Sequence, residues 1–295
     1  MSVQTQTFAT VPDWLLAQLS NHLPYSLPLL RRLQFTKLPR GTSEHARIVL
    51  VSDDTSTCFT VAYVDPAGGP DTHMWLYSTL EDKPLQHAEK AHYTQQLEAT
   101  IQALVAIYKD YGRETSYPGC VLLGTVHSEV RALLEPTGRV IPRAVGGYDK
   151  WLFKTEDLPR TEVALPEGMY WDRASLEDCR VVASRTNLPR PPEKLVAYPS
   201  LVIKLTDGTP IVWAFLGPDA SLMSLHCEPP YRGRGLAKIL AAKLLRERTA
   251  DFGVGELGSA DVAPDNVASR AVCKSLNGTT WWVVSWILLK VGEKV

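Results

Sequence analysis

The sequence predicts an α/β protein, of the α+β type with mixed sheets, built from two halves that share one order of elements. The chain has 295 residues, which is more than one domain usually contains. Each half holds a meander of three expected strands, then a helix, then further alternating strands and helices. A segment at 155–168, with two prolines and mixed charge, separates the halves. We therefore expect two domains, at 1–160 and 161–295.

The first half begins with short apolar groups at 12–33, which Pro24 and Pro28 break into one or two short helices. The longest helical pattern runs from 88 to 111, and Gly112 is suited to end it. His127 precedes a short helix without any partner motif, so we expect it to cap that helix or lie on the surface. The other expected elements are strands at 48–51, 58–64, 73–77, 120–124 and 151–153, and a helix at 128–134.

The second half follows the same order. A strand at 169–172 leads to a helix at 175–185, whose Ser175 and Asp178 have the spacing of a capping box. Pro191-Pro192 opens another short helix. The remaining expected elements are strands at 201–205, 210–216 and 221–227, a helix after Gly235, a strand at 256–262, a helix at 266–276 and a last strand at 282–289.

Composition excludes several classes of function. The net charge is −1, the pI is near 6.7, and no run of five or six like charges occurs, which argues against nucleic-acid or membrane-surface partners. No apolar window is long enough for a membrane span. We expect a cytoplasmic protein. A mitochondrial presequence is the alternative, because the first thirty residues hold one acidic residue, although no basic residue precedes Arg31.

The five cysteines suggest reduced thiols. Their number is odd, they are widely spaced, and no C-x-x-C pair is present, so we expect neither a disulfide framework nor a metal site. They are Cys58, Cys120, Cys179, Cys227 and Cys273.

The stretch from Arg232 to Ala237 carries the strongest functional signal. Two glycines flank Arg234 immediately before an amphipathic helix, so the backbone can approach a ligand closely. The helix N-terminus adds unpaired N–H groups and a partial positive charge, which suit a pyrophosphate. The alternative is a turn that only caps the helix. The dinucleotide pattern G-x-G-x-x-G and the P-loop do not fit.

This stretch, R-G-R-G-L-A after Pro-Pro-Tyr, resembles the acyl-CoA pyrophosphate loop of the GNAT acyltransferase superfamily, Q/R-x-x-G-x-G/A. Arg232, Gly235 and Ala237 occupy its defining positions. The second half also has the GNAT order of elements, and the first half is a degenerate copy without the turn. The whole layout is similar to the glycine N-acyltransferase-like family, supported locally by 208–213, which holds a small turn, a proline and a tryptophan.

The resemblance implies a tandem GNAT fold and an acyl-CoA dependent N-acyltransferase. Acetyl-CoA or another acyl-CoA would be the co-substrate, without a metal, and the acceptor would be a small-molecule amine or an amino acid. A catalytically silent GNAT-like protein that binds CoA or a partner protein is the alternative. Two substitutions favour that alternative: Ser221 stands where several relatives carry Glu or His, and Cys273 stands where many carry Tyr.

The resemblance also implies roles for individual residues. A bulge or divergence would separate the strand at 221–227 from the strand at 256–262, so that the backbone at Leu225, His226 and Cys227 pairs with pantetheine. The Cys227 N–H would stabilise the oxyanion. The pantetheine arm would approach Asn266 and Ser269, and Asn266 is equally suited to cap a helix. The pyrophosphate would lie on Arg232, Gly233, Arg234, Gly235, Leu236 and Ala237.

The general base is the least defined part of the site. Attack of an amine on a thioester needs a group that removes the proton of the amine. The candidates are Asp219, His226 and Glu228, each with a structural role as the alternative. Strand alternation turns His226 and Glu228 away from the face of Ser221 unless the bulge resets it. Cys273 is either an acid for the leaving thiolate or a core residue.

Overall fold

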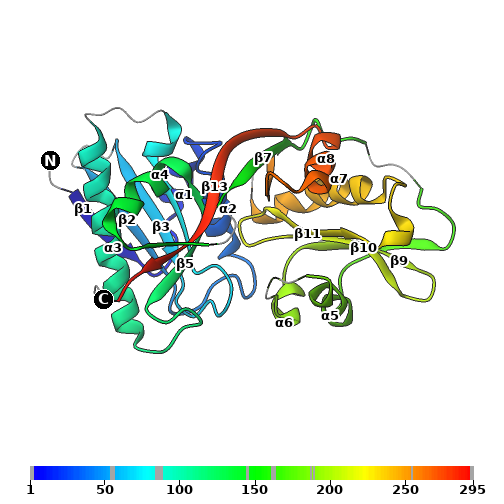
Figure 1. The fold of residues 1–295 in the computed structure, drawn as a ribbon, viewed down its shortest axis with the longest axis horizontal. Coiled ribbons are helices and arrows are strands. Elements are labelled where there is room, and N and C mark those ends of the chain that lie inside the picture. The colour runs from blue at the N-terminus through cyan, green and yellow to red at the C-terminus, as the bar shows by residue number, and fades with distance from the viewer. Residues whose placement is uncertain are drawn as a thin grey trace. The chain divides into compact units, whose positions relative to one another are not determined.

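The computed structural model describes residues 3–53, 57–83, 89–143, 146–160, 164–186, 188, 190–253 and 255–292. These residues form two compact units (Figure 1). The first unit comprises 1–148 together with 282–295, and the second comprises 149–281. The division thus falls after Tyr148, whereas the sequence suggested a boundary after residue 160, and the end of the chain belongs with the first unit.

The first unit is built on one sheet, with strands in the order β1-β2-β3-β4-β5-β13. All neighbours pair antiparallel except β4 and β5. Alternating residues of β2 enter two cores: Val49 and Val51 pack with α3 on one face, and Ile48 and Leu50 pack with α1 and α2 on the other. The elements are β1 (Val3–Phe8), α1 (Asp13–Ser20), α2 (Leu27–Phe35), β2 (Arg47–Asp53), β3 (Phe59–Val64), β4 (Met74–Ser78), η1 (Thr79–Asp82), α3 (Lys90–Tyr111), β5 (Cys120–His127), α4 (Ser128–Leu134), η3 (Glu135–Thr137), β6 (Val140–Pro142) and β13 (Thr279–Lys290).

The second unit has a four-stranded antiparallel sheet, β11-β10-β9-β8. The helices α5 and α6 pack on Trp213 and Phe215 of β10, and α7 contacts the same sheet from its other side (Figure 1). Strand β12 pairs with β7. The elements are β7 (Tyr148–Lys154), β8 (Met169–Asp172), α5 (Leu176–Ser184), α6 (Pro192–Leu195), β9 (Ser200–Leu205), β10 (Pro210–Leu216), β11 (Leu222–Cys227), η4 (Pro229–Tyr231), α7 (Leu236–Arg248), η5 (Thr249–Phe252), β12 (Leu257–Val262) and α8 (Val267–Ser275).

The last strands of the two halves are exchanged. Strand β7 ends the first half of the sequence, yet it pairs with β12 in the second unit. Strand β13 ends the second half, yet from residue 282 onward it lies in the first unit and pairs with β5. Each unit therefore contains a strand pair in which one strand comes from the other half of the sequence.

Most of the expected elements are confirmed within one to three residues. The capping box at Ser175 and Asp178 is present, Gly112 ends α3 with φ 60°, and His127 caps α4. Two strands were missed. Strand β1 is mostly exposed and polar, so it lacks an apolar pattern, and β6 has only three residues. No helix among the described residues is long and apolar enough to cross a membrane.

Candidate active site

The glycine-rich turn adopts a backbone that requires glycine. Gly233 and Gly235 have φ of 75° and 74°, and a Cβ added at either one would meet no protein atom within 4 Å. The strain of a larger residue would therefore come from the backbone alone, and the space beside the turn is open. Gly235 is the N-cap of α7 and no side chain caps that helix end. The first N–H groups of α7 thus remain available to an anion.

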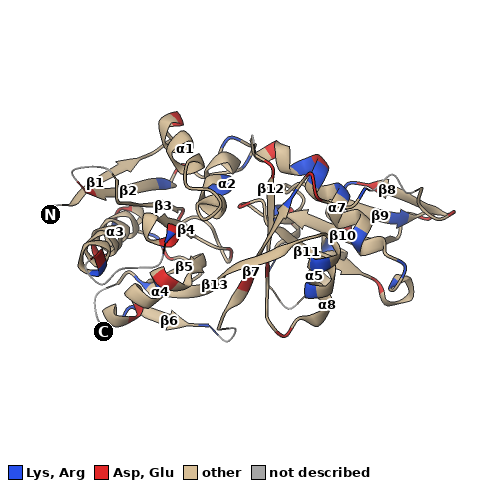
Figure 2. Cartoon of the chain, turned by 90° about the horizontal axis from the view of Figure 1, so that it is seen from above, with Lys and Arg blue, Asp and Glu red and all other residues tan. Residues whose placement is uncertain are grey.

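Two arginines stabilise this turn and give it positive charge. Arg232 donates from Nε to the Cys227 carbonyl at 2.8 Å, so it ties the turn to the end of β11. Arg234 donates to the Pro230 carbonyl at 3.2 Å, and its guanidinium lies 5.6 Å from the centre of the Tyr231 ring. Both side chains are exposed. Further Lys and Arg residues occur along α7 (Figure 2). The turn therefore combines backbone donors with positive charge.

Strand β11 contains the expected bulge. Its register with β10 shifts between the pairs Phe215–Met223 and Trp213–His226, and Ser224 has φ 54°. Because of this shift, Met223 and His226 lie on the same face, the one covered by α5 and α6. The bulge therefore resets the alternation of side chains along β11, and His226 is not turned away from the face of Met223.

Among the described residues, strands β11 and β12 form no ladder, in keeping with the expected divergence. One isolated parallel bridge, Ser221 to Ser259, lies just before β11. Directly after β11, the Glu228 N–H donates to the Ile211 carbonyl of β10 at 2.9 Å. Successive N–H groups in a strand point to opposite edges, so the N–H of Cys227 is directed away from β10. It therefore faces the side on which β12 has separated from β11.

His226 has an environment that keeps it neutral. Its ring stacks on Trp213 with centroids 4.5 Å apart. Burial lowers the pKa of His226, and the neighbouring Glu228 opposes that effect in part. Glu228 Oε2 is 3.7 Å from His226 Nε2, too far for a direct hydrogen bond, and its Oε1 accepts from Arg185 Nε at 2.9 Å. No sequence pattern indicates the Arg185 contact, which joins residues 43 positions apart.

Asp219 lies in a buried charged cluster at the start of β11. Its Oδ1 accepts hydrogen bonds from the Ser221 hydroxyl at 2.5 Å and from the Ser221 N–H at 3.2 Å. Burial raises the pKa of Asp261, Lys150 lowers it, and the charge of Asp219 raises it. Lys150 is fully buried and pairs with Asp261 at 2.7 Å. Asp219 is thus held near a paired carboxylate and ammonium, at the end of β11 remote from Cys227.

Asn266 and Cys273, which follow β12, have the structural roles that were expected as alternatives to functional ones. Asn266 caps α8, because its side-chain oxygen accepts from the Ser269 N–H at 3.0 Å. Cys273 is 3% exposed, and burial raises its pKa to about 12. Its thiol therefore stays neutral near pH 7.

Comparisons with known proteins agree with this architecture. Residues 2–151 match the family model described as the acyl-CoA N-acyltransferase verG N-terminal domain. Residues 153–278 match the acetyltransferase (GNAT) family. No curated protein matches the chain.

Three solved structures share the fold over nearly the full length. A Drosophila protein is 19% identical, with a TM-score of 0.65, covering 97% of this chain and 98% of that one. A tandem GNAT protein from the clavulanic acid biosynthesis pathway is 13% identical, with a TM-score of 0.56 and full coverage of both chains. A GCN5-related N-acetyltransferase from Sphaerobacter thermophilus is 13% identical, with a TM-score of 0.53, covering 99% and 97%.

The match to the verG domain spans 150 of the 295 residues, from 2 to 151. It is followed directly by the GNAT match, on the unit that carries the glycine turn and the parted strands. The chain therefore belongs to the acyl-CoA N-acyltransferase family defined by the verG N-terminal domain, and it is a tandem GNAT enzyme that uses an acyl-CoA.

Proposed function

We propose that the second unit holds acyl-CoA at Arg232–Ala237 and transfers its acyl group directly to the amine of a small molecule or an amino acid. The observation that carries this proposal is the open turn at the N-terminus of α7, directly after a bulged strand that has parted from its neighbour. The pyrophosphate would lie on the N–H groups of Gly233 and Gly235 and of the first turn of α7, with Arg232 and Arg234 adding charge.

The parted strands provide a place for the pantetheine arm. Outward backbone groups of the stretch Leu225–Cys227, those of Cys227 above all, would pair with its amides as a further strand would, while the backbone of His226 pairs with Trp213 of β10. The thioester would then lie beside the Cys227 N–H, which stabilises the oxyanion that forms when the amine attacks. Asn266 and Ser269 at the start of α8 would approach the same arm while Asn266 continues to cap the helix.

The reaction needs one proton acceptor. The amine nitrogen forms a bond to the thioester carbon, the C–S bond breaks, and the thiolate of CoA leaves. Of the three candidates we favour His226, because it adjoins Cys227, its lowered pKa keeps the imidazole unprotonated, and Glu228 lies 3.7 Å away. Asp219 is the less favourable candidate, since its carboxylate already accepts two hydrogen bonds from Ser221.

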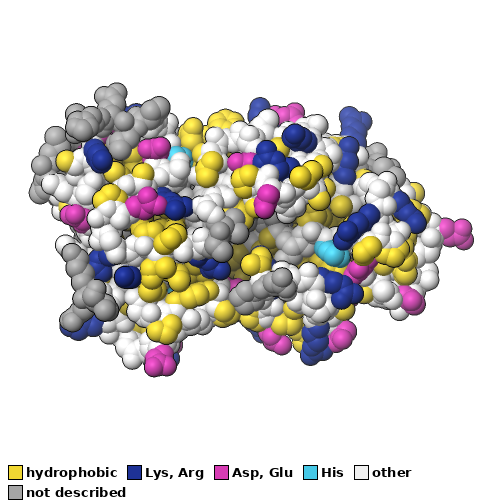
Figure 3. Space-filling model, viewed as in Figure 1, with side chains coloured by type: hydrophobic (Ala, Val, Ile, Leu, Met, Phe, Trp, Pro, Cys, Tyr) yellow, Lys and Arg dark blue, Asp and Glu magenta, His cyan; other side chains and the backbone are white. Residues whose placement is uncertain are grey.

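An amino acid is the acceptor that the local charge favours. Arg185 lies beside Glu228, and Arg190, from the segment after α5, reaches Met223 on β11 with an NH1 to Sδ distance of 3.1 Å. Two guanidinium groups therefore lie beside Glu228 and Met223, and a guanidinium suits a carboxylate. On the face drawn in Figure 3, positive and negative side chains are otherwise interspersed.

The test compares matched acceptors. CoA release from acetyl-CoA and from longer acyl-CoAs would be measured with glycine and methylamine, and with phenylalanine and phenethylamine. We expect the amino acid of each pair to have the higher kcat/KM. Preference for the amine would contradict an acceptor carboxylate, and binding of CoA without turnover on a broad amine panel would contradict the direct-transfer proposal.

A further inference from the structure

Three different metal-ligand side chains converge in the first unit, far along the chain from the glycine turn. Asp53 ends β2, Cys58 immediately precedes β3, and His92 lies in the first turn of α3. One ligand atom from each residue lies within 4.8 Å of the other two. Asp53 is buried, and Cys58 and His92 are half-buried. The cluster therefore offers oxygen, sulfur and nitrogen donors at one end of the sheet.

A buried glutamine orients two of these residues. The Gln96 carbonyl oxygen accepts from the Thr60 hydroxyl at 2.9 Å, so the amide NH₂ must face the other way. That NH₂ donates to the Cys58 carbonyl at 2.8 Å and contacts His92 Nε2 at 3.0 Å. Because Gln96 supplies the hydrogen, His92 Nε2 is the acceptor in this contact. A histidine nitrogen that accepts a hydrogen bond can also bind a metal.

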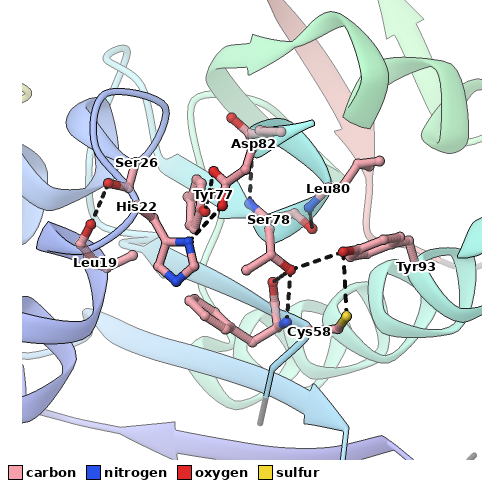
Figure 4. Close-up of polar contacts among 12 residues, drawn as sticks. Leu19, His22, Ser26, Cys58, Tyr77, Ser78, Leu80, Asp82 and Tyr93 are labelled. Carbon is pink, nitrogen blue, oxygen red and sulfur yellow. Dashed lines mark hydrogen bonds and ion pairs between the residues drawn. The ribbon is translucent and has the colours of Figure 1, made fainter. Parts of the chain in front are cut away.

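A tyrosine supports the sulfur ligand. The Tyr93 hydroxyl donates to Cys58 Sγ at 3.6 Å, as drawn in Figure 4. This donor fixes the direction of the sulfur. Such outer contacts are typical of sites in which the ligands are fixed before the ion binds.

We propose that Asp53, Cys58 and His92 bind one Zn²⁺ ion, with water completing the coordination. Cysteine, histidine and aspartate are the ligands that Zn²⁺ takes in proteins, whereas Mg²⁺ and Ca²⁺ prefer oxygen donors alone. Binding releases the Cys58 proton to solvent and replaces the contact of Gln96 with His92 by a metal–nitrogen bond. The ion would join the ends of β2 and β3 to the start of α3.

The sequence pattern gave no indication of this site. Asp53 and Cys58 are close in the chain, but His92 comes from a different element, and the three match none of the paired Cys or His spacings typical of zinc domains. The site lies in the unit without the glycine turn, so the proposal does not depend on the acyl-transfer mechanism.

The test uses the full-length protein after treatment with a chelator. Calorimetric titration with Zn²⁺ should show one equivalent bound, and Co²⁺ should produce the charge-transfer absorption of a thiolate ligand. Cys58→Ser should abolish that absorption, and His92→Gln should weaken Zn²⁺ binding by more than about tenfold. Cys120→Ser removes another partly buried thiol of the first unit and should change neither result.

Two results would overturn the proposal. One is the absence of Zn²⁺ binding to the folded wild-type protein. The other is binding that persists unchanged in both Cys58→Ser and His92→Gln, since the ion would then lie elsewhere. Circular dichroism establishes whether each variant is folded. If Cys58→Ser is unfolded, His92→Gln decides, because its polar side chain preserves a contact with Gln96.

Discussion

The imidazole of His226 stacks on the indole of Trp213, with ring centroids 4.5 Å apart and an angle of 17° between the planes. This contact exists because the bulge at Ser224 brings His226 onto the face of Met223. The same bulge lies where β11 has left β12. One irregularity of the backbone thus sets the position of both the candidate base and the candidate oxyanion donor.

His226→Phe should preserve the stacking and remove the proton acceptor. We expect kcat to fall by about 10²-fold or more, the usual contribution of a general base. In the wild type, the pH profile of kcat/KM should have an acidic limb, in which kcat/KM falls as the pH drops through the pKa of His226. This pKa is lowered from the ordinary histidine value of 6.5. The variant should lack that limb, while His45→Phe, a change in the first unit, should retain it. An unchanged limb in His226→Phe would exclude this residue as the base.

Glu228→Gln should shift the same limb to lower pH. The carboxylate of Glu228 raises the pKa of His226 against the effect of burial, so its removal makes protonation of the ring harder. We expect the enzyme to keep a larger fraction of its maximal rate under acidic conditions. The pH profile of kcat/KM measures this, and a shift toward higher pH would contradict the coupling.

Lys150→Met should destabilise the second unit strongly. Asp261 would be left buried without its ammonium partner, and breaking a buried pair in this way costs about 3–5 kcal/mol. Lys150→Met combined with Asp261→Leu should recover much of the loss, because no unpaired carboxylate remains. Urea unfolding monitored by circular dichroism measures both variants. Equal stability of Lys150→Met and the wild type would show that the pair is not a buried ion pair.

His127 should make stability depend on pH. Burial lowers its pKa to about 4, whereas the unfolded chain takes up the proton near 6.5. The unfolded state therefore binds more protons between these values, and the unfolding free energy falls as the pH drops from 6.5 toward 4, by at most about 3 kcal/mol. His127→Asn keeps a capping acceptor for the Glu129 N–H and should flatten this dependence in urea unfolding. An equally steep dependence in the variant would contradict the assignment.

The sequence predicted most of the second unit because its signals are local. The turn at Gly233 and Gly235, the capping box at Ser175 and the proline-initiated helix α6 each depend on neighbouring residues. Strand exchange could not be predicted in this way. The apolar residues of β13 suit any sheet, and only tertiary pairing with β5 decides which sheet it joins.

The same distinction holds within the candidate site. The bulge and the parted strands were expected from the resemblance, and the structure contains both. The pair of Lys150 with Asp261 joins residues 111 positions apart, and no periodicity or spacing indicates it. The sequence pattern therefore presents Asp219 as a candidate base and does not reveal the buried charges beside it.

We propose that the turn before α7 binds the pyrophosphate of acyl-CoA. Calorimetric titration with CoA tests it in the wild type, in Gly235→Glu and in Gly208→Glu. Gly208 is a matched control, because it too has positive φ, 88°, and open space at its Cβ, and it lies in the turn between β9 and β10. We predict that Gly235→Glu, folded by circular dichroism, loses CoA binding, whereas Gly208→Glu binds as the wild type does. Unchanged affinity in Gly235→Glu would contradict the claim.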